Sequence, residues 1–349
     1  MSAAKGASTP VPAAPGIEAA LTLALVGDIM LGRGVDAALR HMRPHDMWGD
    51  VLPLLWQADL RIANLECALT RHAQPWARGW KMYHFRADPA AVRFLQAARI
   101  DACSLANNHV LDFEVRGLVD TLHALDAARI RHAGAGPDSA AAVAPALLDA
   151  GGAAPCRVAL LSFTDNEPAF AAAGQHPGTN YLEVSLDDAT LARVAYAIGR
   201  ARAAGADLVV FSNHWGANFV ERPTPEFRAF ARRVIELGAD VYYGHSAHLC
   251  QGIEIHCGKP ILYDCGDFID DYAVDPLLRN DRSCLFRLTF ATGSLRSVEL
   301  FPVKLDVAQV ALARGDDFAA IAARMEMLCA ELGTRLERHA DRLVYAPRP

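Results

Sequence analysis

The sequence predicts an α/β protein, because apolar runs typical of buried strands alternate along the chain with amphipathic stretches typical of helices. The first apolar run, residues 21–27, is nearly continuous and ends at a Gly-Asp pair, as a strand buried on both faces would. A second run, residues 58–65, also ends at a polar cluster. Further strands are expected at residues 100–105, 157–163, 208–212, 241–243 and 260–264.

Helices are expected between these strands. The clearest is residues 88–98, which opens with an acidic cap followed by proline. The other predicted helices are residues 34–42, 114–128, 187–204 and 225–238. Towards the C-terminus we expect an antiparallel hairpin over residues 283–303, turning at 289–294, a closing helix over 316–335, and, earlier, surface loops around a short strand in the alanine-rich stretch 133–154.

The length and composition indicate one enzyme-sized domain. The chain has 349 residues, of which 52% are apolar, enough to bury a large core without a partner. No long polar break interrupts the pattern, so we expect a single domain over residues 19–349, with the C-terminal hairpin and helix beginning at about residue 283. Residues 1–18, rich in Ala, Pro, Ser and Gly, predict a disordered leader.

Charge and cysteine usage argue against several functional classes. The net charge is -6 and no cluster of Lys and Arg appears, which predicts that the protein does not bind nucleic acid. The apolar stretch 19–26 is too short to span a bilayer, so no integral membrane segment is expected. The eight cysteines are scattered, with no C-x-x-C pair. These features together predict a cytoplasmic protein with reduced thiols.

Polar side chains follow five of the predicted strands at the point where each strand ends. They are Asp28; Glu66; Asn107, Asn108 and His109; His214; and His245 with His248. Because ligands bind at the carboxyl ends of strands in an α/β sheet, groups far apart in the sequence can converge there. Oxygen and imidazole ligands without thiolates suit Mn²⁺, Fe²⁺ or Zn²⁺. The sequence therefore predicts a divalent metal site at this edge.

Each of these residues also has a purely structural interpretation. Asp28 could cap a turn, since Asp bonds readily to local backbone amides. Glu66 at the mouth of a buried strand needs either a metal or an ion pair to offset desolvation. His214 taken alone is more often a hydrogen-bonded histidine than a ligand, whereas two imidazoles three residues apart in a Gly-rich turn can face one centre.

Substrate contacts are expected from residues around this edge. Arg33, Lys81, His84 and Arg86 could hold a carboxylate or phosphate, or simply face solvent. Asp165, after the strand that ends at residue 163, could reach the site from the same sheet edge. Asp267, Asp270 and Asp271 could form a second acidic rim or a solvated loop.

Several sequence blocks, in order, resemble the CapA-type capsule or poly-gamma-glutamate biosynthesis family, within the calcineurin-like metallophosphoesterase superfamily. The resemblance covers about residues 21–303. It is carried by the blocks at residues 27–33, 64–66, 106–109 with Asp112, 214–216, 244–248, 251–254, 258–261 and 266–268. It implies a four-layer αββα sandwich of the metallophosphoesterase type, with a two-metal centre at one edge.

The resemblance also implies a role for each ligand. Asp28 and His248 would hold the first metal. Asn108, His214 and His245 would hold the second, with Glu66 bridging both. His109 would be the catalytic acid, oriented by Asp112; a carboxylate there would offset the cost of an imidazolium near two cations.

Two departures from the superfamily pattern affect the function that we expect. The first strand ends Asp28-Ile29-Met30, so the histidine of the D-x-H motif is absent, and Asn218 stands where similar chains often have an acidic residue. The favoured function is a metal-dependent hydrolase with a dinuclear centre, acting on a phosphoester or amide-like bond of a small molecule, a peptide or a polyglutamate-like chain. The alternatives are a metal-dependent epimerase of a peptide or amino-acid carboxylate and a non-catalytic capsule-biosynthesis component.

Overall fold

Two mixed sheets form the centre of the structure, a computed structural model that describes residues 20–151 and 155–347. The predicted leader, residues 1–18, lies outside these ranges. The larger sheet has the strand order β19-β20-β17-β16-β1-β2-β5-β6, with β15 attached to β1 and β18 to β17. Its strands are β1 (Ala20–Ile29), β2 (Leu60–Leu65), β5 (Ala102–Ser104), β6 (Arg131–Ala133), β15 (Asp267–Ile269), β16 (Arg282–Ala291), β17 (Ser294–Asp306), β18 (Gln309–Leu312), β19 (Glu337–Arg338) and β20 (Leu343–Tyr345).

The smaller sheet has the order β13-β14-β12-β11-β9-β8. Its strands are β8 (Ala146–Ala150), β9 (Cys156–Thr164), β11 (Leu208–His214), β12 (Val241–His245), β13 (Ile253–His256) and β14 (Lys259–Leu262). In each sheet four neighbouring strands are parallel: β1, β2, β5 and β6 in one, and β9, β11, β12 and β14 in the other. Two short pairs, β3 (Ala68–Leu69) with β4 (Arg86–Ala87) and β7 (Ala135–Gly136) with β10 (Gly178–Thr179), lie apart from them.

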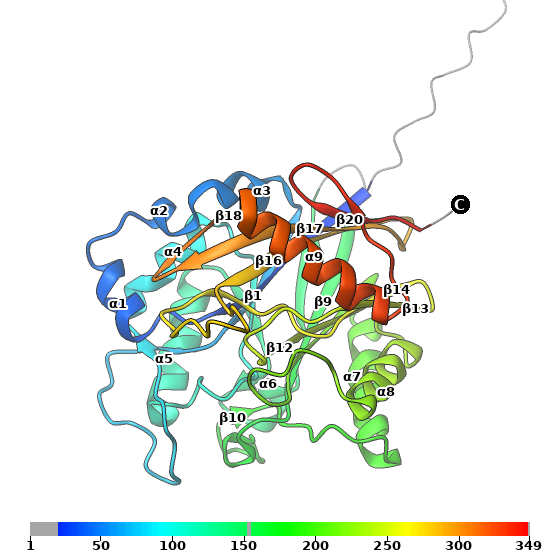
Figure 1. Ribbon diagram of the computed structural model, residues 1–349. Helices are drawn as coiled ribbons and strands as arrows, with labels where there is room; N and C mark the ends of the chain where they lie inside the picture. The colour runs from blue at the N-terminus through cyan, green and yellow to red at the C-terminus, as the bar shows by residue number, and fades with distance from the viewer. Residues whose placement is uncertain (1–19, 152–154, 348–349) are drawn as a thin grey trace, which may run out of the picture.

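Three apolar clusters define four layers. The cluster between the sheets combines side chains from both, such as Leu23, Ile62, Leu160 and Val210. A second cluster packs the outer face of the larger sheet against α1 (Arg33–Leu39), α2 (Pro44–Trp48), α3 (Leu52–Gln57), α4 (Val92–Ala97) and α5 (Glu114–Ala127). A third packs the smaller sheet against α7 (Asp188–Ala203) and α8 (Pro225–Glu236), which lie on the opposite side of the molecule in Figure 1. The predicted α/β class and four-layer arrangement are therefore confirmed.

Most predicted helices and strands form at the predicted residues, because helix caps and apolar faces are determined by residues close together in the sequence. Asp187 and Thr224 accept hydrogen bonds from backbone N–H groups at the starts of α7 and α8. The helix expected at 88–98 begins as a 3-10 turn, Pro89–Ala91, before α4. The strand expected from residue 58 begins at Leu60, since residue 58 is the C-terminal cap of α3.

The C-terminal region holds more strands than expected. The predicted hairpin is β16 and β17, and the closing helix is α9 (Gly315–Glu331), but the chain then adds β19 and β20 to the larger sheet. The stretch 133–154 contains β7, a short helix α6 (Ser139–Ala142) and β8 rather than loops around one strand, with residues 152–154 outside the described ranges.

Among residues 20–151 and 155–347, no helix is both long and apolar enough to cross a membrane. The cytoplasmic location and the single-domain boundaries stay predictions.

Candidate metal centre

The carboxyl ends of the central parallel strands in both sheets meet at one edge and carry polar side chains. Asp28 near the end of β1 pairs in register with Asn64 on β2 and with Asp267 on β15. His214 and His245 end β11 and β12 and are register partners in the smaller sheet. The close approach needs glycine at Gly27, where a Cβ would lie 1.9 Å from the carbonyl oxygen of Gly266. Local strand pairing therefore brings residues far apart in sequence to one point.

Asp28, His214 and His245 form the first group of candidate ligands. The Nδ1 atoms of His214 and His245 are 2.9 Å apart, and His245 Nδ1 lies 3.7 Å from Asp28 Oδ1. Asn64 donates to Asp28 Oδ1 at 2.7 Å, and Ser212 Oγ lies 2.8 Å from His245 Nε2. All three candidate ligands are buried, with ligand atoms within 4.8 Å of one another, as a shared cation requires.

Asp28, Glu66, His248 and Asp267 form the second group, also buried and within 4.8 Å of one another. His248 Nδ1 lies 2.8 Å from Asp267 Oδ1 and 3.9 Å from Asp28 Oδ2. Glu66 accepts a hydrogen bond from the hydroxyl of Tyr272 at 3.3 Å, and its Oε1 is 3.8 Å from His214 Nε2. The carboxylate common to both groups is Asp28, whereas the resemblance assigned the bridge to Glu66.

Asp267 is the site residue that sequence reasoning did not assign to the centre. The sequence offered it only as part of an acidic rim or a solvated loop, yet it is fully buried because β15 pairs in parallel with β1. Its signal was present: Gly266-Asp267 follows an apolar run, as Gly27-Asp28 does. Asp270 is also buried, whereas Asp271 pairs with Arg33 at 3.0 Å.

Among the candidate and predicted ligands, four buried polar atoms have no hydrogen-bond partner: Asp28 Oδ2, Asn108 Oδ1, His214 Nε2 and Asp267 Oδ2. All belong to candidate ligands or to the predicted ligand Asn108. Leaving such atoms unpaired in a protein interior costs about 1–3 kcal/mol each, and more for a charged group. Divalent cations would satisfy all of these electron-pair donors, so the residues present fit a metal site.

The titration behaviour of the centre leads to the same conclusion. Burial, followed by the charge of Glu66, raises the pKa of Asp28 well above its usual value. Burial likewise raises the pKa of Glu66 to about 8 and that of Asp267 well above its ordinary range. Burial lowers the pKa of His214 strongly and that of His245 to about 3, so both imidazoles are neutral. Neutral imidazoles are the form that binds metal, and a cation would stabilise the crowded carboxylates.

His109 and Asp112, predicted as acid and orienting group, lie together beside this centre. His109 Nδ1 is 2.5 Å from Asp112 Oδ2, which also accepts from the backbone N–H of Phe85 at 2.6 Å. His109 Nε2 lies 3.8 Å from Glu66 Oε1, and its ring stacks on Phe85 at 4.0 Å. Burial lowers the pKa of His109 and raises that of Asp112 to about 7. With Nδ1–H donated to Asp112, Nε2 carries the free lone pair.

A cavity of about 520 Å³ opens beside these groups. Its lining includes Asn108, His109 and His248 together with two of the five predicted substrate residues, Arg33 and Lys81. Lys81 is nearly buried, donates to the carbonyl oxygen of Asn108, and pairs with Asp112 at 3.2 Å.

The other three predicted substrate residues do not line this cavity. Arg86 donates to the carbonyl of His72 at 2.5 Å and lines a separate, smaller cavity with Asp36 and Asp88. His84 packs edge-on against Phe113 with its ring centre 6.3 Å away. Asp165 accepts a hydrogen bond from the backbone N–H of Gly216 at 3.1 Å, so it shapes the turn after β11.

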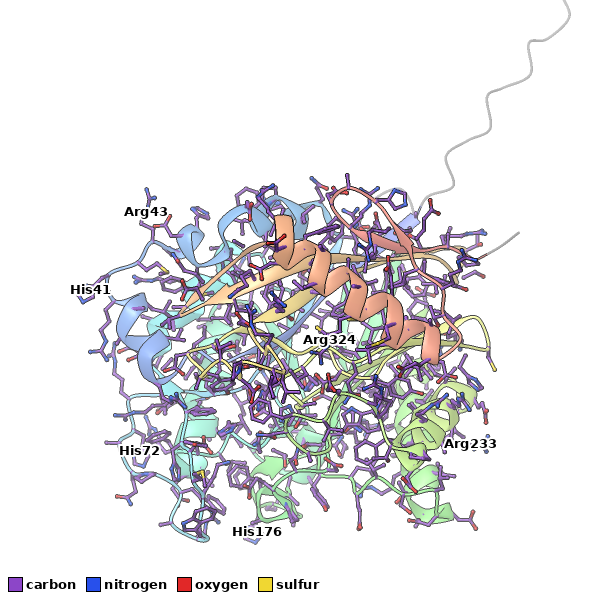
Figure 2. The ribbon with its side chains drawn as sticks, in the orientation of Figure 1. His41, Arg43, His72, His176, Arg233 and Arg324 are labelled. Atoms are coloured by element: carbon purple, nitrogen blue, oxygen red, sulfur yellow. The ribbon has the colours of Figure 1, made fainter. Side chains whose placement is uncertain are left out.

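The concentration of imidazoles at this edge is not a simple result of composition. The chain has 13 histidines. In Figure 2, His41, His72 and His176 lie at the periphery of the molecule, pointing away from the centre. His109, His214, His245 and His248, by contrast, are all buried at the strand ends.

The fold and the site together define a four-layer α/β protein with a buried carboxylate and histidine centre at the meeting edge of its sheets. Residues 22–272 match the family described as bacterial capsule synthesis protein PGA_cap, and the chain belongs to this family. The family resemblance drawn from the sequence blocks is therefore confirmed.

Relatives with assigned names are consistent with this membership. The chain is 32% identical to the "Probable polyglutamine synthesis accessory protein" of Mycobacterium tuberculosis, over 93% of this chain and 95% of that protein. It is 30% identical to the capsule biosynthesis protein CapA of Bacillus anthracis, over 72% of this chain and 60% of that protein. It is 27% identical to the PGA biosynthesis protein CapA of Bacillus subtilis, over 72% of this chain and 63% of that protein.

Solved structures resemble the chain only distantly. The protein TT1561 of Thermus thermophilus aligns with a TM-score of 0.41 and 12% identity, over 78% of this chain and 99% of that one. The sulfate thiohydrolase SoxB of the same organism aligns with a TM-score of 0.42 and 14% identity, over 90% of this chain and 61% of that one. Scores this low assign no role to any residue of this chain.

Proposed function

We propose that the protein is a metal-dependent hydrolase with two divalent ions, Mn²⁺, Fe²⁺ or Zn²⁺, at the sheet edge. The observation that carries the proposal is the set of four buried, unpartnered donor atoms contributed by Asp28, Asn108, His214 and Asp267. Asp28, His214 and His245 would hold one ion, with Asn108 as a further ligand, and Asp28, Glu66, His248 and Asp267 would hold the other. Asp267 would thereby supply the ligand that the missing D-x-H histidine would otherwise provide.

The chemistry divides between the ions and the side chains. When bound, two divalent cations lower the pKa of water and neutralise developing negative charge. Asn64 and Ser212 orient Asp28 and His245, and such supporting hydrogen bonds keep ligands in place. His109, held by Asp112, exchanges a proton through Nε2 on the side of Glu66 and the cavity.

The substrate that we propose is an amide-linked chain, either a peptide or a polyglutamate-like polymer. The relatives named for polyglutamine and PGA biosynthesis support this class. The cavity of about 520 Å³ is large enough for a few linked residues and borders His109 and His248. An amide also needs a proton on its leaving nitrogen; neutral His109 would accept a proton at Nε2 from the attacking water and then deliver it to that nitrogen.

One observation favours epimerisation as a second candidate. His109 is neutral because burial lowers its pKa, and it is oriented by Asp112, so it could accept an alpha proton as readily as return one. Exchange of a substrate alpha proton with deuterated solvent, without bond cleavage, would distinguish this reaction from hydrolysis.

The test combines metal analysis with turnover. Protein purified without added metal is analysed for bound ions, then assayed against a panel of phosphoesters, peptides and polyglutamate. We expect bound divalent ions and hydrolysis in wild type, and reduced metal content in Glu66→Ala and Asp267→Ala. Wild type without any affinity for divalent ions would rule out the proposal. Bound metal without turnover or exchange on the panel would instead favour a non-catalytic role in capsule biosynthesis.

A further inference from the structure

The mouth of the cavity beside the candidate metal centre carries a cluster of exposed apolar side chains. Trp80 is 84% exposed, Met82 63%, Tyr83 55% and Phe219 43%, and all four line this cavity. Single exposed apolar residues are common on soluble proteins, but a group around a cavity indicates a binding surface. We call these four residues the apolar rim.

The apolar rim is assembled from two segments that the centre itself holds in place. Trp80, Met82 and Tyr83 lie in the loop between β3 and β4, which Lys81 anchors by donating to the carbonyl oxygen of Asn108. Because this anchor reaches a predicted metal ligand, the loop position is tied to the centre.

Phe219 faces this loop from the segment after β11. Its φ of +60° is uncommon for a bulky side chain, and such backbone strain concentrates at functional sites. A hydrogen bond of 2.8 Å from its backbone N–H to the carbonyl of Ala247 fixes it to the turn that carries His245 and His248. The Phe219 ring lies 5.9 Å from that of His248, yet it stays partly exposed. The ring is thus held at the entrance rather than buried in a core.

The charged groups of the cavity do not suit a continuous polyanion. Arg33 pairs with Asp271 at 3.0 Å and lies over the rings of Tyr83, Phe85 and Tyr272. Lys81 pairs with Asp112 at 3.2 Å and with Glu167 at 3.5 Å. Among the described residues that line the cavity, Arg33 and Lys81 are the Lys and Arg side chains, and each already faces a carboxylate. A run of glutamates would therefore contact apolar side chains at the cavity mouth rather than unpaired Lys or Arg side chains.

We propose that the apolar rim is a subsite for a bulky apolar side chain of a peptide substrate, adjacent to the bond presented to the centre. The preferred substrate is then a peptide with an aromatic or large aliphatic residue, not an uninterrupted glutamate polymer. The position of the reacting bond rests on the proposed hydrolase function. Selection of the side chain rests on Trp80, Met82, Tyr83 and Phe219.

The test measures binding to the metal-loaded protein by isothermal titration calorimetry with three capped pentapeptides. One is all glutamate, and the other two carry Phe or Ala at the central position between glutamates. We expect the Phe peptide to bind at least about tenfold more tightly than the Ala peptide, about 1.4 kcal/mol, because burial of an aromatic ring on the rim supplies that much. Trp80→Ala should reduce this advantage to about threefold or less.

The control is Tyr196→Ala, which removes an exposed aromatic ring from α7, away from this cavity. It should preserve the full preference for the Phe peptide. Trp80 is so exposed that its replacement should leave folding intact, and a thermal melt checks this. Equal or tighter binding of the all-glutamate peptide, or an undiminished preference in Trp80→Ala, would overturn the subsite.

Failure of the subsite and failure of the hydrolase proposal are separable, because binding does not require turnover. A preference for Phe without cleavage of any peptide would leave the subsite standing and count against hydrolysis. Cleavage of all three peptides at similar rates, together with similar binding affinities, would support hydrolysis and count against the subsite.

Discussion

The two sheets contribute different chemistry to the same edge. The larger sheet, through β1, β15 and the segments after β2 and β5, supplies oxygen donors: Asp28, Glu66, Asn108 and Asp267. The smaller sheet, through β11, β12 and the turn after it, supplies imidazoles: His214, His245 and His248. Neither sheet alone could form the two ligand groups, so the centre exists only because the sheets pack face to face.

The carboxylates from the larger sheet and the imidazoles from the smaller sheet have pKa values shifted in opposite directions for one reason. Burial raises the pKa values of Asp28, Glu66 and Asp267 and lowers those of His214 and His245. In each case burial disfavours the charged form. A cation would offset the penalty on the carboxylates and would bind the imidazoles in the neutral form that they already have. The carboxylates would therefore need a cation in order to be charged, whereas the imidazoles are in the metal-binding form without one.

The largest effect is expected when the oxygen and imidazole ligands are compared directly, through Asp28→Asn and His245→Ala. Asp28 belongs to both ligand groups and His245 to one. We expect Asp28→Asn to lose both ions and to lower the hydrolysis rate at least about a thousandfold, since several kcal/mol of charge stabilisation disappear. His245→Ala should retain about one ion per chain. Plasma mass spectrometry and initial rates measure both effects.

Asp149→Asn serves as the matched control, because Asp149 is an exposed carboxylate paired with Arg157 at 2.7 Å, beside the start of β9 and not at its carboxyl end. It should keep full metal content. Equal metal loss in Asp28→Asn and His245→Ala would contradict the view that Asp28 is shared.

The fold was predictable where local signals are strong. Strands buried on both faces, such as β9 and β11, read as continuous apolar runs, and α7 and α8 carry clear caps. The short helices α2 and α3 contain five and six residues, too few to establish a helical period. Both residues of β19 are exposed, so that strand depends on pairing with β20 and leaves no pattern in the sequence.

The site was predictable as far as strand ends define it. All five polar clusters lie at the meeting edge of the sheets, since parallel strands align their carboxyl ends. Asp267 was not predicted as a ligand because its strand, β15, has only three residues and so leaves no strand pattern in the sequence. His84 and Arg86 lie in and next to a loop without regular structure, where spacing does not determine the direction of a side chain. Which carboxylate is shared depends on distances that no sequence pattern contains.

The next test uses pH to separate the carboxylates from the imidazoles in metal-free protein. Above about pH 7.5 histidines are mostly neutral in both the folded and the unfolded chain, so they add little slope. Glu66, whose pKa is raised to about 8, is still largely protonated there in the folded chain but ionised in the unfolded chain. The folded state then binds more protons, and its stability should fall by on the order of 1 kcal/mol between about pH 7.5 and 9.

Urea unfolding of chelator-treated protein at several pH values measures this slope. Saturating divalent ion should remove most of it, because the metal-bound carboxylates are ionised at every pH in the window. Glu66→Gln should make the slope of the metal-free protein shallower, by the share that Glu66 contributes. A metal-free protein whose stability rises across the window would contradict a carboxylate cluster that lacks its cation.

The smallest expected effect concerns the support of the imidazoles by the smaller sheet. Ser212 Oγ lies 2.8 Å from His245 Nε2, so a His245 that binds metal through Nδ1 must donate its Nε2–H to this serine. Ser212→Ala removes that acceptor and frees the ring to adopt the other tautomer. Metal affinity at the His245 group should fall about tenfold, at the lower end of effects for groups that orient ligands.

Ser162→Ala is the matched control for Ser212→Ala. Ser162 is a buried serine directly opposite Ser212 on the neighbouring strand β9, but its Oγ bonds to Ser104 at 2.6 Å and not to a candidate ligand. Ser162→Ala should lose at least as much folding stability as Ser212→Ala, since the Ser162 hydroxyl also accepts a hydrogen bond from the backbone N–H of Ala106 at 3.3 Å. Only Ser212→Ala should weaken metal binding, as measured by competition with a chromogenic chelator. If both weakened it equally, general loosening of the smaller sheet, rather than tautomer control at His245, would account for the change.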